Sequence, residues 1–270
     1  MELFGITTGQ DEVYQSIRQR FTRVLCLTVL LLPALAHSNP YLPKPGEAPV
    51  TVYVSTCAVT GGFIHFYTAL DQKILEKYGI NVKHVVIRGG TNVNLAALGT
   101  DEVQFLYCAA DSTIPGMATG RDATLIASPL VGLPYLIIAR KEIRTVQDLK
   151  GKTIGVGTVA GLPYQLLKAF VKKFGLEDMQ IRPLGGSQPE RYNALLQGVI
   201  HAAPFTPPMD ARGKKDGFNI VYHLNDLGLP AIYSSLHTNA KTIRERRLTV
   251  QRFVAAIAES VRLVDASVAT

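Results

Sequence analysis

The chain has 270 residues, of which 47% are hydrophobic, and this is enough apolar material for one large domain or two lobes. Its formal net charge is +7, but the 28 lysines and arginines are scattered, with small clusters only at Lys214–Lys215 and Arg244–Arg247. A scattered excess is typical of a basic surface and argues against a nucleic-acid groove. We therefore expect no nucleic-acid partner, while docking onto an acidic partner remains an alternative use of the charge.

The N-terminal 36 residues have the three parts of a secretory signal. Arg18, Arg20 and Arg23 precede the apolar run VLCLTVLLLPALA, which closes on small residues at Ala36. The run is too short to cross a bilayer comfortably, so an uncleaved anchor is the less favoured alternative. We predict a signal peptide that is cut after Ala36, a mature chain that begins at His37, and a periplasmic location.

Short apolar runs alternate with helical patterns from Val50 onward. This order predicts mainly parallel α/β sheets with helices on both faces. The expected strands and apolar runs are residues 51–56, 82–87, 103–108, 123–127, 133–139, 153–156, 179–183, 200–203 and 219–223. The expected helices are residues 63–78, 92–98, 162–174, 188–197, 207–215 and 243–264.

The chain also contains an approximate internal repeat. EKYGINVKHVVIRGGTN carries Gly79 and, ten residues later, Gly89-Gly90-Thr91. KKFGLEDMQIRPLGGSQ carries Gly175 and, after the same interval, Gly185-Gly186-Ser187. The shared order of helix end, strand, glycine pair and short helix indicates two similar α/β lobes.

Six loops lie where a strand ends and a helix begins, which is where parallel α/β sheets gather ligands. They are rich in glycine, hydroxyl groups and free backbone N–H groups, and helix N-termini attract anions. The alternative is that the glycines only form tight turns and helix caps. The loops are residues 56–62, 89–92, 108–112, 158–162, 185–188 and 204–207.

Catalytic motifs are poorly represented. The stretch TIGVGTVAGLPYQLLKA at residues 153–169 looks like a phosphate loop, but it lacks the Lys-Ser/Thr pair that such a loop needs. The six histidines show no metal-ligand spacing, and no nucleophile-elbow sequence is present. We therefore expect no catalytic residue, no metal and no cofactor. Asp111 is the one acid in a candidate loop; we expect it to cap its helix, with contact to a ligand amine as the less favoured role.

Several segments resemble the periplasmic substrate-binding proteins of ABC importers, in the group that handles nitrate, sulfonates, taurine and pyrimidine precursors of thiamine. Besides the signal, the segments are LDQKILEKYGINVKHVVIRGG, AALGTDEVQF, TVQDLKGKTIGVG and LLQGVIHAAPFTPPMDARGKKDGF. DLKGKTIGV is the most specific, because it commonly opens the second lobe in this group. The resemblance covers about residues 50–265 and implies a type II periplasmic-binding fold, with two α/β lobes, two crossovers and a ligand cleft between the lobes.

The resemblance also implies a division of the chain. We expect a signal peptide at 1–36, a linker at 37–49, lobe one at 50–139, lobe two at 140–235 and a return to lobe one at 236–270. Because members of this group usually continue well past the helix at 243–264, we expect that return to be truncated.

Matching positions imply which residues surround the cleft, and they come from strand ends and helix starts in both lobes. The expected ligand-binding residues are Ser55, Thr56, Cys57, Thr60, Gly61, Gly62, Gly90, Thr91, Ala110, Asp111, Ser112, Tyr135, Thr158, Ala160, Gly161, Pro204, Phe205 and Thr206. Cys57 departs from the first-loop pattern that is usual in the group, which leaves the fine specificity open.

We expect a monomeric, non-enzymatic receptor that closes about a hinge on a small-molecule solute and delivers it to an ABC permease. An enzyme on the same fold, such as a pyrimidine-precursor synthase, and a ligand-sensing domain are the alternatives. The expected solute is anionic or planar and polar, because the loops carry hydroxyls and helix N-termini but almost no acids. Candidates for stacking a ring or pairing a charge are Phe63, Tyr135, Tyr164, Phe205, Arg88 and Arg191.

The implied fold also suggests a disulfide. Residues 51–56 and 103–107 would be parallel neighbours, and each is followed directly by a cysteine, Cys57 or Cys108. Adjacent strands lie about 4.8 Å apart, which is within the usual Cα separation of a disulfide. An oxidising compartment would permit the bond. Two unpaired, half-buried cysteines are the alternative.

Overall fold

The computed structural model describes residues 39–159, 161–185 and 187–268. The predicted signal peptide and the expected ligand-binding residue Ala160 therefore lie outside the described residues. Tyr41–Thr270 form one compact unit, to which the following description refers. Within the described ranges, no helix combines the length and the apolar character needed to cross a membrane.

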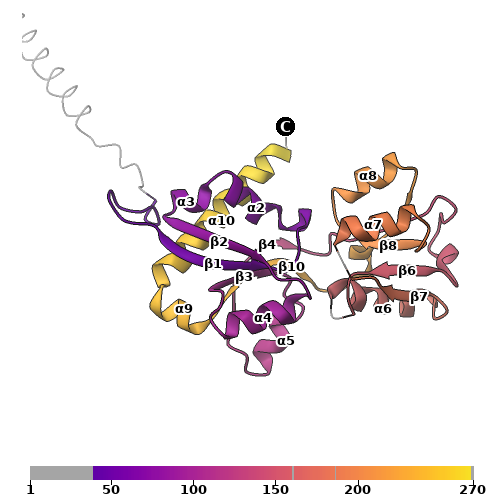
Figure 1. Ribbon diagram of the computed structural model, residues 1–270, viewed down its shortest axis with the longest axis horizontal. Coiled ribbons are helices and arrows are strands. Elements are labelled where there is room, and N and C mark those ends of the chain that lie inside the picture. The colour runs from indigo at the N-terminus through magenta and orange to yellow at the C-terminus, as the bar shows by residue number, and fades with distance from the viewer. Residues whose placement is uncertain (1–38, 160, 186, 269–270) are drawn as a thin grey trace, which may run out of the picture. The chain divides into compact units, whose positions relative to one another are not determined.

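Ten strands of the described chain form two five-stranded sheets (Figure 1). The strands are β1 Val50–Thr56, β2 Ile80–Val86, β3 Phe105–Cys108, β4 Thr124–Val131, β5 Leu136–Ala139, β6 Thr153–Val156, β7 Gln180–Pro183, β8 Ala202–Phe205, β9 Asn219–His223 and β10 Ile232–Thr238. The first sheet has the order β2-β1-β3-β10-β4 and the second the order β7-β6-β8-β5-β9. We call each sheet with its helices lobe one and lobe two.

The helices are short except for α6 and α10. In lobe one they are η1 Gly61–Phe63, α2 Ile64–Asp71, α3 Ile74–Lys77, α4 Thr91–Gly99, α5 Thr113–Ala118, α9 Ala240–Glu245 and α10 Arg247–Val268. In lobe two they are α6 Leu162–Phe174, α7 Gln188–Leu196, α8 Met209–Lys215 and the 3₁₀ turns η2 Gln147–Leu149 and η3 Leu224–Leu227. In Figure 1, α2, α3 and α10 lie along one face of the first sheet, and α4 and α5 lie on the other.

The two lobes repeat one strand arrangement, as the sequence repeat predicts. In each sheet four strands run in one direction, and a single strand, β10 or β5, runs against its neighbours. The fold class predicted from the sequence is therefore confirmed at this level: two α/β lobes with mainly parallel sheets.

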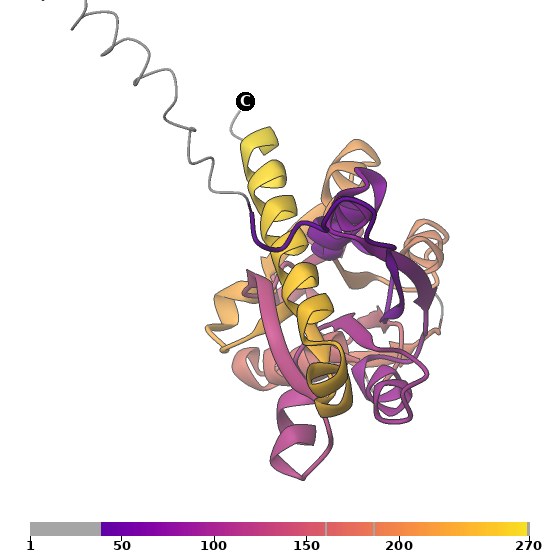
Figure 2. The ribbon, with the colours of Figure 1, turned by 90° about the vertical axis from the view of Figure 1, so that its left-hand side faces the viewer.

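Alternating side chains of the central strands bury both faces of each sheet. In β3, Phe105 and Tyr107 belong to the core beneath α2 and α10, whereas Leu106 and Cys108 pack beneath α4. Phe105 stacks on Phe253 of α10 with ring centroids 4.5 Å apart, and Figure 2 shows α10 running beside β4. Successive side chains of β3 point to opposite faces of the sheet, and both faces are buried. The strand is therefore apolar at every position.

The chain passes between the sheets twice, once between β4 and β5 and once between η3 and β10. The side chain of Asn225 in η3 ties the two crossovers together, because its Oδ1 accepts the backbone N–H of Leu133 at 3.0 Å. The return to the first sheet begins at Ile232, a few residues before position 236.

The helix predicted over residues 63–78 is divided into η1, α2 and α3, which corrects that prediction. Lys73 adopts a left-handed conformation with φ 54° and separates α2 from α3. An unbroken helix would continue the face of Phe66 and Ala69 into Lys73 and Lys77. The interruption instead turns the side chains that follow it toward the core, and these are the buried Ile74, Leu75 and Tyr78.

Apart from the 3₁₀ turns η2 and η3, two elements have no counterpart among the predicted ones, the helix α5 and the strand β10. β10 is buried although it reads IYSSLHT, because its hydroxyl groups have partners inside the protein. Ser235 donates to the carbonyl of Cys108 at 2.6 Å, and Thr238 donates to the carbonyl of Gln104 at 2.8 Å. Satisfied hydroxyls thus take the place of the apolar residues expected in a central strand.

The disulfide suggested by the sequence is present in the structure. β1 and β3 are parallel neighbours in which Thr56 lies opposite Tyr107, so that the following residues, Cys57 and Cys108, are also opposite. The two cysteines are bonded, with Cα atoms 5.7 Å apart and a sequence separation of 51. The bond therefore joins two neighbouring strands at the end of the sheet where ligand-binding residues are expected.

We expect the disulfide to stabilise the fold by about 2–4 kcal/mol, mainly by restricting the unfolded chain. In a chain that begins at His37, thiol titration after unfolding without reductant should find no free thiol. Denaturant unfolding of the double variant Cys57→Ala, Cys108→Ala should show the loss of stability. Two free thiols in the unreduced protein would contradict the bond.

A second prediction concerns acid stability. Burial lowers the pKa of His237 to about 4, from the 6.5 of an exposed histidine, while its Nε2 contacts the hydroxyl of Ser235 at 2.7 Å. The unfolded chain takes up this proton as pH falls below 6.5, but the folded chain does so only near pH 4, so stability is lost across that window. The free energy of unfolding, measured with urea, should be about 3 kcal/mol lower at pH 4 than at pH 7 because of this histidine. His237→Gln should reduce the difference; an unchanged pH dependence in this variant would refute the assignment.

Candidate functional site

Hydroxyl groups from both lobes meet where the loop after β1 approaches the loop after β8. Thr60 Oγ1 lies 2.6 Å from Thr206 Oγ1 and 3.4 Å from the phenolic oxygen of Tyr233. Thr60 and Thr206 are buried, and Tyr233 is only 3% exposed. Lobe one and lobe two therefore touch directly through polar groups.

Two glycines permit this close approach. A Cβ at Gly61 would clash with the backbone carbonyl of Pro207 in lobe two, and a Cβ at Gly62 would clash with the ring of Tyr233. Neither glycine has a positive φ, so close contact and not backbone conformation requires the missing side chain.

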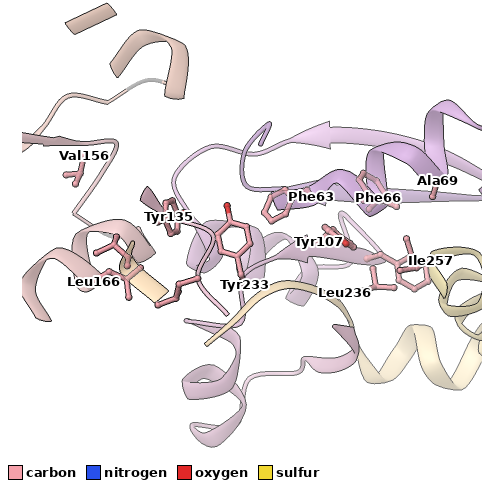
Figure 3. Packing of buried hydrophobic residues seen from close by; sticks show 14 of the residues in the cluster. Phe63, Phe66, Ala69, Tyr107, Tyr135, Val156, Leu166, Tyr233, Leu236 and Ile257 are labelled. Carbon is pink, nitrogen blue, oxygen red and sulfur yellow. The ribbon is translucent and has the colours of Figure 1, made fainter. Parts of the chain in front are cut away.

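Two tyrosines stand at the crossovers between the lobes. Tyr135 precedes β5 and Tyr233 lies near the start of β10, and their rings meet edge to face with centroids 5.3 Å apart. Figure 3 shows Tyr233 between Tyr135 and Phe63. Burial raises the pKa of both phenols, so each is a neutral hydrogen-bonding group at neutral pH.

Helix α7 supplies the lobe-two groups beside these hydroxyls. Its start is fixed by a capping box in which Ser187 and Glu190 satisfy each other's backbone N–H groups. Gln188 then holds Thr206 with both ends of its amide: Nε2 donates to Thr206 Oγ1 at 2.9 Å, and Oε1 accepts the Thr206 N–H at 2.8 Å. Arg191 follows one turn later on the same face of α7.

Arg191 is a buried cation without an acidic partner. It is 7% exposed, its Nε has no hydrogen-bond partner, and no acid of the described residues lies within ion-pair distance of it. Burial lowers its pKa. Arg252, which is also strongly buried among the described residues, does have an acidic partner: Glu47 accepts hydrogen bonds from two of its nitrogens at 2.6 and 2.9 Å. Arg191 therefore forms no ion pair with an acid of the described residues, although the charge of Glu190, the preceding residue, acts on it.

A second polar group lies in lobe one where β3 ends. The Asp111 carboxylate accepts the Thr91 hydroxyl at 2.7 Å and a long contact of 3.5 Å from the Ser112 hydroxyl. Burial raises the pKa of Asp111. Ser112, and not Asp111, is the N-cap of α5, and its side chain makes no capping bond, so the expectation that Asp111 is the capping residue is wrong. Its carboxylate instead faces the first residue of α4.

The remaining expected site residues occupy several environments. Ser55 and Thr56 are buried in β1, where Thr56 Oγ1 lies 2.9 Å from Nε2 of His84, and Cys57 is in the disulfide. Gly90 precedes α4, and Ala110 donates its N–H to Ile232 at 3.0 Å. Thr158 and Gly161 lie before α6, where the Gly161 N–H donates to the Thr158 carbonyl at 3.3 Å. Pro204 is a buried residue of β8.

The aromatic and basic residues that we expected to contact a ligand also occupy different environments. Phe205 is fully buried against Tyr192 of α7, with ring centroids 5.7 Å apart, so it packs in the core of lobe two. Phe63 is likewise a core residue. Tyr164 is partly buried on α6 beneath Lys168. Arg88 is exposed, in contrast to Arg191.

Three residues of the contact were absent from the expected ligand-binding residues: Tyr233, Gln188 and Pro207, although Gln188 and Pro207 lie in the predicted loops 185–188 and 204–207. The position of Gln188, directly after a Gly-Gly-Ser stretch that starts a helix, is a signal that sequence reasoning could have used. Tyr233 lies in the strand that the apolar pattern did not reveal.

A separate groove of about 460 Å³ lies between α2 and α10. Its lining carries no charged side chain and consists of Ile64, Thr68, Gln72, Leu263, Val264 and Ser267. The described residues contain no group of three or more histidine, cysteine, aspartate or glutamate side chains arranged to hold a metal ion.

Comparison with known proteins supports the fold. The structure is similar to that of the alkanesulfonate-binding protein SsuA from Xanthomonas axonopodis pv. citri bound to MOPS. The match covers 83% of this chain and 77% of that protein, with a TM-score of 0.66 and 19% sequence identity. A second match, to the periplasmic aliphatic sulphonate binding protein SsuA from Escherichia coli, covers 82% of this chain and 71% of that protein. Its TM-score is 0.62 and the sequence identity is 20%. At these identities the likeness shows the fold, which is that of the type II periplasmic-binding proteins.

Sequence comparison adds a family. The chain is 25% identical over 208 residues to a putative ABC transporter periplasmic binding protein of Brachyspira hyodysenteriae, and this match spans 71% of the chain but only 59% of the relative. The profile of the family described as NMT1/THI5 like matches residues 61–266, which is more than half of the sequence. The chain therefore belongs to the NMT1/THI5-like family.

Proposed function

We propose that this protein is an extracytoplasmic solute receptor that holds a small organic anion between its lobes and delivers it to an ABC permease. The observation that carries the proposal is Arg191, a buried guanidinium with no acid of the described chain to neutralise it. A buried charge without a partner is costly, and an anionic ligand removes that cost. The proposal assigns binding and transfer of the solute, without a catalytic step.

The polar groups where the two lobes meet, which α7 links to Arg191 through Gln188, suit an oxyanion. The hydroxyls of Thr60, Thr206 and Tyr233 can each donate a hydrogen bond, and the guanidinium presents N–H groups in a fixed plane. A sulfonate offers three acceptor oxygens and stays charged at neutral pH. The sulfonate-binding proteins among the structural relatives, together with the periplasmic binding protein among the sequence relatives, make an organic sulfonate the class we propose first.

Hinge motion at the two crossovers would admit and release the ligand. Both crossovers contain a glycine with positive φ, Gly132 at 98° and Gly228 at 70°, and Asn225 joins them through Leu133. The ligand would contribute contacts to both lobes and so stabilise the state in which they touch. The predicted signal peptide supports a location outside the cytoplasm, where such receptors meet their permease.

Removal of the Arg191 charge should weaken anion binding by at least about 30-fold, because truncating one member of a buried charge pair costs about 2 kcal/mol or more. Calorimetry with ethanesulfonate, propane-1-sulfonate, MOPS, sulfate and nitrate would compare the protein with Arg191→Gln. Arg182→Gln is the matched control, since it removes an exposed arginine from lobe two. Equal affinities in all three proteins would contradict the proposed role of Arg191.

A side chain at Gly61 should hinder closure. In Gly61→Ala the new methyl group meets the Pro207 carbonyl, so the state with touching lobes is destabilised by about 1–3 kcal/mol. We expect weaker solute binding with little change in the unfolding midpoint, since the lobes can separate without unfolding. Gly99→Ala is the control, because a Cβ there has nothing within 4 Å. Unaltered affinity in Gly61→Ala would show that the lobes bind solute without this contact.

A further inference from the structure

The two cysteines of the disulfide lie in different surroundings. Cys108 is fully buried and packs in the apolar cluster beneath α4. Cys57 is partly exposed, and it is the first of four residues, 57–60, that belong to no helix or strand. In the same segment Val59 is 68% exposed. A second molecule can therefore approach the bond from the side of Cys57, while the side of Cys108 is closed to it.

The buried sulfur has a neighbour that suits a thiol better than a disulfide. Thr91 Oγ1, on the first residue of α4, lies 3.3 Å from Cys108 Sγ. The single hydroxyl proton of Thr91 is directed to other acceptors, Asp111 Oδ1 at 2.7 Å or the Ala109 carbonyl at 3.1 Å. The Thr91 oxygen therefore faces the sulfur with a lone pair, which a disulfide cannot use but which can accept the proton of a Cys108 thiol. The reduced state thus finds a hydrogen-bond acceptor already in place.

The bond is also the covalent support of the segment that carries Thr60. Residues 57–60 run from the end of β1 to η1, and the disulfide ties their first residue, Cys57, to β3. A hydrogen bond from the Tyr67 hydroxyl to the Ala58 carbonyl, at 3.1 Å, also holds the segment. Cleavage of the disulfide would leave noncovalent contacts alone to hold it against the rest of lobe one.

We propose that Cys57 is a thiol-exchange site, through which a dithiol reductant opens the disulfide and loosens the segment 57–60. A thiolate of the reductant attacks Cys57 Sγ, forms a mixed disulfide there and displaces Cys108, which takes up a proton and becomes a buried thiol. The second thiol of the reductant then attacks its own partner sulfur in the mixed disulfide, so that Cys57 leaves as a thiol. The protein gains two electrons and two protons, and the dithiol becomes a disulfide. This inference does not depend on the identity of the solute.

Reduction of the unaltered protein tests whether the folded state is attacked. The chain that begins at His37 would be treated with dithiothreitol at several urea concentrations below the unfolding transition, and the thiols released would be counted with time. Attack at an accessible sulfur needs no unfolding, so the rate should vary by less than about twofold across the series. A rate that rises more steeply with urea would mean that the bond is reached only in unfolded forms, and would overturn the proposal.

Single-cysteine variants test which sulfur reacts. Cys108→Ala leaves the thiol of Cys57, and Cys57→Ala leaves that of Cys108, so each variant is the matched control of the other. In native buffer Cys57 should react with 5,5′-dithiobis(2-nitrobenzoate) at least about 10-fold faster than Cys108, and the two rates should converge in concentrated urea. Equal rates in variants with the circular dichroism of the unaltered protein would overturn the proposal. If a variant does not fold, the reduction of the unaltered chain still decides.

Hydrogen exchange tests the consequence for the segment. After reduction the amides of residues 57–60 should exchange at least about 10-fold faster, while those of β6 and β8 in lobe two keep their rates. Equal exchange in the oxidised and reduced proteins would show that the bond does not order this segment. Loss of the folded protein's circular dichroism on reduction would show that the bond is needed by the whole fold. Either result would overturn the proposal.

Discussion

The central physical constraint in this protein is the burial of the Arg191 guanidinium without an acid to accompany it. Desolvating a charge is expensive, and proteins usually offset the cost with a carboxylate, as Glu47 does for Arg252. At Arg191 no acid forms an ion pair; its surroundings include the phenols of Tyr135 and Tyr233 and the Phe205 ring, and the charge of Glu190, the preceding residue, acts on it without pairing. A site that leaves its own charge without an ion pair is suited to an external anion, and in the proposed function the two lobes enclose that anion.

The scaffold gives each part of the site a fixed support. Both sheets have the same strand order, and in each the strand that runs against the others, β10 or β5, follows a crossover. The tyrosines at these two strands therefore stand both at the crossovers and at the proposed ligand site. Within lobe one, the disulfide between Cys57 and Cys108 joins the two strands whose ends carry Thr60 and Asp111. In the proposed function, opening would take place at the crossovers, because the disulfide braces this end of the sheet.

The sequence predicted the lobes well because their signals are local: apolar runs of strand length, glycines after helices and a ten-residue interval repeated. It missed β10 because burial there depends on hydroxyl groups whose partners, such as the Cys108 carbonyl, are more than a hundred residues away. It ran α2 into α3 because nothing local marks Lys73 as left-handed. It could not tell Arg191 from Arg88 as the site arginine, since each lies near a glycine pair and the sequence does not show that Arg191 is buried while Arg88 is exposed.

The most direct test of the central claim is a crystal structure of the chain from His37 with the tightest ligand found by calorimetry. Our account requires an anionic group of that ligand within hydrogen-bond distance of the Arg191 guanidinium, enclosed by the segments that carry Thr60 and Thr206. A ligand bound elsewhere, for example in the uncharged groove between α2 and α10, with Arg191 still lacking an anionic partner, would contradict it.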